Sequence, residues 1–153
     1  MLKLYRRFRM WLRVRSFNGY VGRFYAPDEP GMGVFNERIY AGAFENAKPM
    51  MVRVCLAGEL RDKYEHDLSI DWSDFSPPPP EVRELLEEVR MHMRMQHPVY
   101  VGCYGGTGRT GTFLALLAKM DGIESPIAYV RNEYRKQAVE TRPQERFVKE
   151  YEV

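Results

Sequence analysis

The sequence predicts one compact α/β domain with a central, mostly parallel sheet flanked by helices. Segments rich in valine and isoleucine mingle with longer segments of helical periodicity, and a glycine-rich loop joins an apolar strand to a buried helix. A chain of 153 residues, 44% of them hydrophobic, is long enough to bury one core. We expect residues 38–153 to form this domain and residues 1–37 to form a basic N-terminal arm with loops.

Four segments have the composition of strands. Residues 38–43 and 50–57 carry β-branched residues and are flanked by turn residues, and residues 68–71 fit a short third strand. Residues 99–102 form the apolar strand before the glycine-rich loop. The four prolines of residues 72–80, WSDFSPPPP, exclude a helix or a central strand and indicate an exposed loop.

The other core segments are helical in pattern. Apolar residues at helical spacing predict a helix over 81–96, and the nearly uniform apolarity of 110–120 predicts a helix buried in the domain centre. A capping Ser125, followed by a proline, predicts a helix that runs to about Lys136. A last helix is expected after Pro143.

The N-terminal segment is strongly basic. Its first 27 residues carry a charge of +7 and the rest of the chain −5, an asymmetry typical of contact with nucleic acid, anionic lipid or an acidic partner. Four apolar residues share one helical face: Leu4, Phe8, Trp11 and Leu12. Residues 13–15 fit a strand edge equally well, and residues 16–37 have the composition of turns and loops. We favour a surface element packed on the domain; the alternative is contact of residues 3–23 with anionic lipid or RNA.

The composition also bears on location. No run of 18 apolar residues is present, which predicts that no segment spans a membrane, and the interrupted apolar residues of the N-terminus differ from a secretory signal. The two cysteines, Cys55 and Cys103, are too few for the disulfide framework of small secreted domains. We therefore expect a cytoplasmic location, and we expect neither a metal ion nor a cofactor.

Residues 98–112, PVYVGCYGGTGRTGT, fit two phosphate-binding motifs. Glycines 106, 108 and 111 match the GxGxxG fingerprint of dinucleotide-binding loops, which requires a second strand with an acidic end about 20 residues on. Residues 125–136 are instead polar and helical in pattern. The loop also lacks the GxxxxGK[ST] pattern of nucleoside-triphosphate loops, so the dinucleotide interpretation is disfavoured.

The second motif is Cys103-x5-Arg109, in which the cysteine ends a buried strand and the arginine begins a buried helix. Because glycines tolerate unusual backbone angles, the loop can turn its N–H groups inward around a tetrahedral dianion. The expected cup comprises Tyr104, Gly105, Gly106, Thr107, Gly108 and Arg109. We expect Arg109 to clamp two phosphate oxygens, the positive field to favour a Cys103 thiolate, and Thr110 to donate to the sulfur. The alternative is an inert buried cysteine.

A cysteine that attacks phosphorus needs an acid to protonate the leaving oxygen. Asp74, exposed between an aromatic residue and the prolines of the 72–80 loop, is the first candidate. Asp71 is the rival and lies closer to the strand, while His66 and His97 lack a supporting context.

These features resemble the cysteine-dependent protein tyrosine phosphatase superfamily, whose signature is HCxxGxxR[ST]. Residues 102–111, GCYGGTGRTG, end like the loops of the tyrosine-specific and phosphatase-and-tensin-type branches. The triplet at 72–74 followed by Pro77 resembles the family's WPD-type loop, and RIYAGAFENAKP resembles the first strand region of dual-specificity phosphatases. The resemblance covers residues 38–151 and implies that the glycine-rich loop is the phosphatase loop.

The resemblance also assigns roles. It implies that Asp74 is the general acid and that Gln144, in AVETRPQERFV, positions the hydrolytic water. Gly102 stands where the family has histidine, and Ser73 where its acid loop has proline. The KNRY segment of the tyrosine-specific branch is not evident.

The implied activity is that of a phosphomonoester hydrolase with a cysteinyl-phosphate intermediate. Tyr104 and Thr107 are neutral, whereas phosphatase-and-tensin-type enzymes that act on phosphoinositides place lysines there. A phosphoprotein substrate is therefore favoured, with phosphotyrosine first and dual specificity open. The alternatives are an RNA 5′-triphosphatase, a phosphoinositide phosphatase and a phosphate-binding pseudophosphatase.

Cys55 lies in MVRVCLAGE, which resembles a strand of phosphatase-and-tensin-type enzymes that carries a resolving cysteine. The resemblance implies a reversible Cys55–Cys103 disulfide that protects the nucleophile. A small buried strand residue is an equally good interpretation of Cys55.

Overall fold

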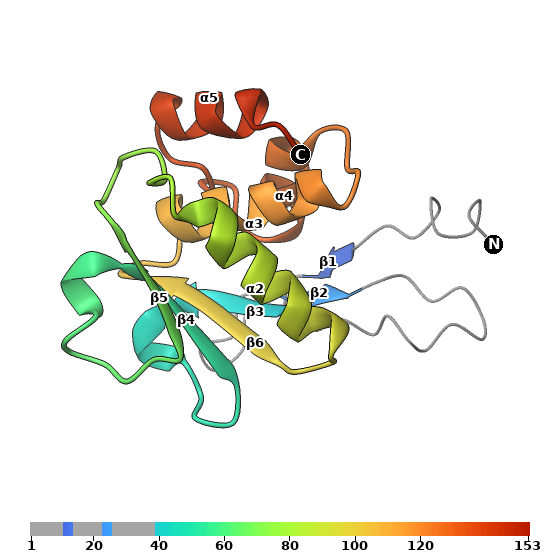
Figure 1. The fold of residues 1–153 in the computed structure, drawn as a ribbon. Helices are drawn as coiled ribbons and strands as arrows, with labels where there is room; N and C mark the ends of the chain where they lie inside the picture. The colour runs from blue at the N-terminus through green and yellow to red at the C-terminus, as the bar shows by residue number, and fades with distance from the viewer. Residues whose placement is uncertain (1–10, 14–22, 26–38) are drawn as a thin grey trace, which may run out of the picture.

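The computed structural model describes residues 11–13, 23–25 and 39–153. In this part of the chain, six strands form one sheet in the order β1-β2-β3-β6-β4-β5 (Figure 1). The strands are β1 (Trp11–Arg13), β2 (Arg23–Tyr25), β3 (Ile39–Ala43), β4 (Val52–Ala57), β5 (Leu68–Trp72) and β6 (Val99–Cys103). Strands β3, β6, β4 and β5 run parallel, and β1 and β2 extend the β3 edge in antiparallel fashion. The predicted α/β class with a mostly parallel sheet is confirmed.

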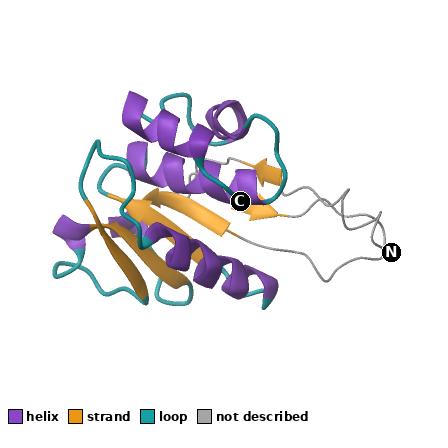
Figure 2. Ribbon diagram, turned by 45° about the horizontal axis from the view of Figure 1, so that its top comes forward, coloured by secondary structure: helices purple, strands orange, loops and turns teal. Residues whose placement is uncertain are grey.

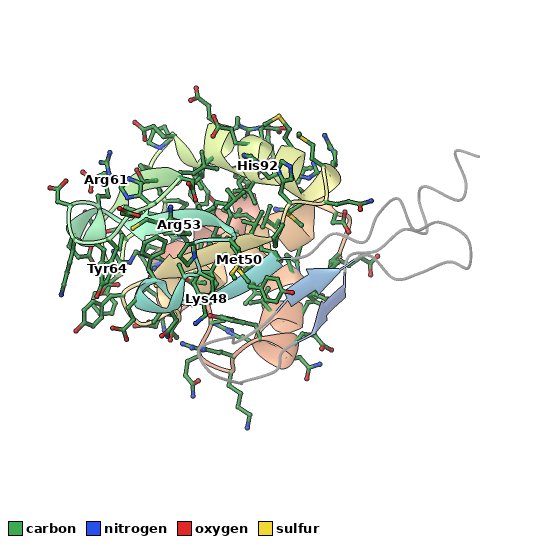
Figure 3. The ribbon with its side chains drawn as sticks, turned by 90° about the horizontal axis from the view of Figure 1, so that it is seen from below. Lys48, Met50, Arg53, Arg61, Tyr64 and His92 are labelled. Atoms are coloured by element: carbon green, nitrogen blue, oxygen red, sulfur yellow. The ribbon has the colours of Figure 1, made fainter. Side chains whose placement is uncertain are left out.

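The described helices lie together on one face of the sheet. They are α2 (Val82–Arg94), α3 (Gly108–Met120), α4 (Pro126–Glu133) and α5 (Arg142–Glu150), with short 3₁₀ turns η2 (Phe44–Asn46) and η3 (Gly58–Leu60). Helices α2 and α3 contact each other and β6, and α4 and α5 pack on α3 (Figure 2). Figure 3 views the other face, where Lys48, Met50 and Arg53 lie over the strands. None of these described helices is long and apolar enough to cross a membrane.

The core places the glycine-rich loop at the centre of the fold. Strand β6 is buried along its whole length between β3 and β4, and α3 is buried from Gly108 to Ala118, as its uniform apolarity predicts. The loop between them leaves the carboxyl end of the central strand and enters a helix N-terminus. Ligands of open parallel sheets bind at such an edge. The element after α3 is a helix, so the second strand of a dinucleotide fold is missing from this position.

The N-terminal expectations were partly wrong. Trp11 and Leu12 lie in a strand rather than a helix, and residues 23–25 form a strand rather than a loop. The reason is long-range pairing: Trp11 pairs with Tyr25, and Arg23 pairs with Tyr40 at the sheet edge, which overrides local periodicity. Leu4, Phe8 and most of the basic arm lie outside the described residues.

Helix ends also differ from expectation. Helix α4 ends at Glu133 rather than near Lys136, and the Ser125 side chain makes no capping hydrogen bond, because its ψ of 71° lies outside the extended conformation of a capping residue. Helix α2 ends at Arg94, since Gln96 adopts a left-handed φ of 61°. Helix α5 begins at Arg142, before Pro143 rather than after it.

Candidate active site

The loop from Cys103 to Arg109, which is predicted to form a phosphate cup, turns back over the Cys103 sulfur. The Cys103 side chain is buried, and its Sγ accepts hydrogen bonds from the Gly106 N–H at 3.2 Å and from Thr110 Oγ1 at 3.1 Å. Gly106 has a φ of +75°, and a Cβ there would lie 2.4 Å from the backbone of Gly42. Glycine is therefore required at this position. Two hydrogen-bond donors are therefore directed at the sulfur.

Side chains from outside the loop hold its carbonyl groups. The buried Tyr134 hydroxyl donates to Gly106 O, Arg135 donates to Gly105 O at 2.6 Å, and Thr112 donates to Gly108 O at 2.7 Å. Burial raises the pKa of Tyr134, so its hydroxyl remains a donor at neutral pH. Sequence reasoning missed Tyr134 and Arg135, whose positions in an ordinary helical pattern give no signal of this role.

Arg109 is held in place by Glu59, another residue that sequence reasoning missed. Its guanidinium is 1% exposed and donates to both Glu59 carboxylate oxygens, at 2.8 and 2.6 Å, and to Trp72 O at 2.9 Å. Burial opposes the charge of Arg109, but the bond to Glu59 and the negative charges nearby raise its pKa overall. Hydrogen bonding to Arg109 lowers the pKa of Glu59. The pair fixes the orientation of the guanidinium.

One edge of the Arg109 guanidinium makes no hydrogen bond to the described residues. Of its five N–H hydrogens, two on Nη1 and one on Nη2 are used, which leaves the Nε hydrogen and the second Nη2 hydrogen. These two lie on the same edge and match two oxygens of a tetrahedral anion. The buried Nε has no hydrogen-bond partner among the described residues, and the nearest carboxylate oxygen is Asp74 Oδ1 at 3.5 Å.

Asp74 lies on a tight turn beside this edge. The Ser76 N–H donates to Ser73 O, and the indole of buried Trp72 donates to Ser76 O at 2.8 Å. The Asp74 carboxylate accepts the Phe75 N–H at 3.0 Å. The turn thus brings Asp74 to Arg109.

The rival acid–base residues lie elsewhere. Asp71 is exposed, with its carboxylate against Gly58 in η3. His66 contacts Tyr64 O, and His97 pairs with His92 at 3.0 Å. The structure therefore brings Asp74 to the cup and gives the other three different partners.

Gln144 is fully buried and lies between the cup and the turn. Its Oε1 accepts the backbone N–H groups of Glu140 and Thr141, and its Nε2 donates to Ser76 O at 3.2 Å. A Cβ added to Gly108 would lie 3.4 Å from Oε1. Both the oxygen and the nitrogen of the amide therefore have protein partners, and one of the two Nε2 hydrogens has no partner among the described residues.

Gly102 has a steric explanation. A Cβ at this position would lie 2.7 Å from Phe44 Cα and 2.8 Å from Gly42 O, both backbone atoms. The histidine that the family signature has here does not fit against η2.

Cys55 lies in β4, in register with Gly102 of β6. Partners in a ladder share a face of the sheet, so Cys55 and Cys103 point to opposite faces. The Cys55 thiol donates to Ala57 O at 3.4 Å, and burial raises its pKa. Both cysteines are free. No described group of three or more acidic, cysteine or histidine side chains is arranged to hold a metal ion.

Two curated proteins are similar in sequence to part of the chain. Two uncharacterised proteins of Methanocaldococcus jannaschii, MJ0215 and MJECL20, are each 44% identical to the chain over 85 residues, which is 55% of this chain. That stretch covers 54% and 58% of their lengths, so the chain spans little more than half of these curated relatives.

Two solved structures share the fold. Tk-PTP in its active form aligns with a TM-score of 0.60 at 24% identity, over 74% of this chain and 88% of that one. Kinase associated phosphatase, with its catalytic cysteine replaced by serine, aligns with a TM-score of 0.57 at 18% identity, over 74% of this chain and 84% of that one.

The family model described as "Swiss Army Knife protein, DSP-PTPase phosphatase domain" (PTP-SAK) matches residues 65–148, a stretch that holds the Asp74 turn, the cup and Gln144. Since this stretch is more than half of the chain, the chain belongs to this DSP-PTPase family of the dual-specificity phosphatase superfamily.

Proposed function

We propose that the protein hydrolyses phosphomonoesters through a cysteinyl-phosphate intermediate. The observation that carries the proposal is the Nε–Nη2 edge of Arg109, which makes no hydrogen bond to the described residues, together with a cysteine sulfur that accepts two hydrogen bonds. A phosphate dianion on that edge receives two charge-assisted hydrogen bonds from Arg109 near the Gly106 N–H that is directed at the sulfur. Its phosphorus then faces the nucleophile.

In the first step, the Cys103 thiolate attacks phosphorus and the bond to the leaving oxygen breaks, while Asp74 gives its proton to that oxygen. Asp74 Oδ1 lies 3.5 Å from Arg109 Nε, so the acid is beside the edge of Arg109 that holds the phosphate in this proposal.

In the second step, water attacks the phosphorus of the thiophosphate, and the S–P bond breaks to release inorganic phosphate and the thiolate. Asp74 takes the proton from the water, and the Thr110 hydroxyl stabilises the departing sulfur. The remaining Nε2 hydrogen of Gln144 is available to orient this water. The same cycle serves any phosphomonoester that fits the mouth of the cup.

A phosphotyrosine-bearing protein is the proposed substrate, with phosphoserine and phosphothreonine next. Tyr104 is 70% exposed at the mouth and, with Tyr64, lines a recess of about 150 Å³ that also includes Lys63 and Glu45. Aromatic side chains suit the ring of phosphotyrosine, since ring pairs add favourable contact beyond area burial. The neutral residues at 104 and 107 give no added charge for a polyphosphorylated ligand.

A substrate panel tests the proposal. Wild-type protein and Cys103→Ser are incubated with phosphotyrosine and phosphoserine peptides, phosphoinositides and triphosphate-ended RNA, and released phosphate is measured. We expect turnover of the phosphotyrosine peptide by wild type and none by Cys103→Ser. Preference for RNA or phosphoinositide would replace the substrate assignment. Equal turnover by both proteins would contradict the mechanism, and binding without turnover by wild type would identify a pseudophosphatase.

A further inference from the structure

The N-terminus of α5 is closed by a capping box. Thr141 is the capping residue, and its Oγ1 accepts the Gln144 N–H at 3.4 Å. In return, Gln144 Oε1 accepts the Thr141 N–H at 3.2 Å and the Glu140 N–H at 2.9 Å. This arrangement satisfies backbone donors that a helix start otherwise leaves unpaired.

The same two side chains also reach out of the helix to the acid turn. Thr141 Oγ1 donates to Phe75 O at 2.9 Å, and Gln144 Nε2 donates to Ser76 O at 3.2 Å. These carbonyls belong to the two residues that follow Asp74. Figure 1 shows the segment between β5 and α2 rising to meet α5. Each side chain therefore accepts from its own helix and donates to the turn.

The acid turn needs such anchors. Phe75 has a φ of 62°, a conformation that a phenylalanine holds only when surrounding contacts enforce it. Ser73 stands where the acid loop of the wider superfamily has a rigid proline. Ser73 precedes Asp74 in the chain, whereas the carbonyls that Thr141 and Gln144 bind belong to the two residues that follow it. These anchors fix the position of Phe75, whose N–H binds the Asp74 carboxylate.

We propose that Thr141 and Gln144 are positioning residues that hold the Asp74 turn against Arg109. The proposal rests on the proposed role of Asp74 as the general acid. It gives Gln144 a task additional to that of orienting water, because its amide oxygen and one of its two Nε2 hydrogens are committed to the cap and the turn.

Gln144→Glu tests the hydrogen bond to the turn separately from the capping box. Glutamate keeps the oxygen that closes a capping box but has no N–H to give to Ser76 O. Thr141→Val removes both the donor to Phe75 O and the acceptor of the Gln144 N–H, and Thr141→Ser restores both. Ser125→Ala is the matched control, because Ser125 holds the capping position of α4 and its side chain makes no hydrogen bond there.

The first readout is amide hydrogen exchange of residues 72–76, which is independent of turnover; the prolines that follow have no amide hydrogen. We expect exchange to rise about fivefold or more in Gln144→Glu and Thr141→Val, the factor for one lost hydrogen bond. Exchange in α2 should stay unchanged, as should exchange at 72–76 in Ser125→Ala and Thr141→Ser. Unchanged exchange at 72–76 in both altered variants would overturn the proposal.

The second readout is the dependence of kcat on the leaving group. A displaced acid should lower kcat for phenyl phosphate by about ten- to a hundredfold, and for p-nitrophenyl phosphate much less, because nitrophenolate leaves without a proton. Thr141→Val carries this readout, because Gln144 also has the proposed task of orienting the water of the second step, which both substrates share. An equal loss on both substrates in Thr141→Val would show a general structural defect and refute positioning. Absence of wild-type turnover would contradict the proposed function, while exchange would still decide whether the anchors hold the turn.

Discussion

Gly102→Ala tests the steric reason for glycine at the position before the cysteine. The new Cβ would lie 2.7 Å from Phe44 Cα and 2.8 Å from Gly42 O, whereas ordinary contact begins at 3.4 Å. The backbones would have to separate by about 0.7 Å. Gly42 and Gly102 are register partners in β3 and β6, so this movement opens the centre of the sheet.

Overpacking of this kind costs about 1–3 kcal/mol. For a domain of this size, each kcal/mol lowers the melting temperature by about 2–4 °C, so Gly102→Ala should melt about 2–12 °C below wild type in a thermal scan followed by circular dichroism. Gly105→Ala is the matched control, because its Cβ would meet nothing within 4 Å and its φ is not positive. That variant should change stability by less than about 1 kcal/mol. The steric explanation fails if Gly102→Ala has the same melting temperature as wild type, or if both variants lower the melting temperature by the same amount.

Three further predictions concern the site. Asp74→Asn should lower kcat on phenyl phosphate by about 10²–10⁴ and abolish the fall in rate that deprotonation of an acid causes as pH rises; if Asp71→Asn has this effect instead, the acid is misassigned. Hydrogen bonding to Arg109 lowers the pKa of Glu59, so its stabilising effect is present above the ordinary glutamate pKa of about 4.3 and is lost as pH falls further. Between pH 7 and pH 3 the melting temperature should therefore fall less in Glu59→Gln than in wild type. Parallel plots of melting temperature against pH for the two proteins would contradict this linkage. Cys55 and Cys103 point to opposite faces of the sheet, so mild peroxide should form a disulfide between them slowly in native buffer and faster in moderate urea. Rapid, stoichiometric disulfide formation in native buffer, detected by mass spectrometry, would contradict this orientation of the two side chains.

The parts of the fold that local pattern encodes could be predicted. The apolar strand at 99–103 and the uniformly apolar helix after it define the centre of the sheet, and the spacing from Cys103 to Arg109 identifies the loop between them. The proline-rich context and the family resemblance predict Asp74 as the acid, and the structure places its carboxylate 3.5 Å from Arg109 Nε. Each of these signals lies within a few residues of the feature that it predicts.

The contacts that organise the site could not be predicted in this way. Glu59 meets Arg109 across 50 residues, and Thr141 meets Phe75 across 66. Neither spacing has a local signature, because the tertiary fold brings together residues that are distant in the sequence. The three-residue strands at 11–13 and 23–25 are likewise set by pairing at the β3 edge, not by their own periodicity.

The carbonyls of Gly105, Gly106 and Gly108 all receive side-chain hydrogen bonds, from Arg135, Tyr134 and Thr112. The cup is therefore preorganised: the entropy that a flexible loop would lose on closing around an anion was already lost when the domain folded. Inorganic phosphate and vanadate should then bind without ordering the loop, and Tyr134→Phe should weaken both. Discrimination among substrates falls to the groups that the rest of the ligand touches outside the cup, because the cup has the same shape for every phosphate.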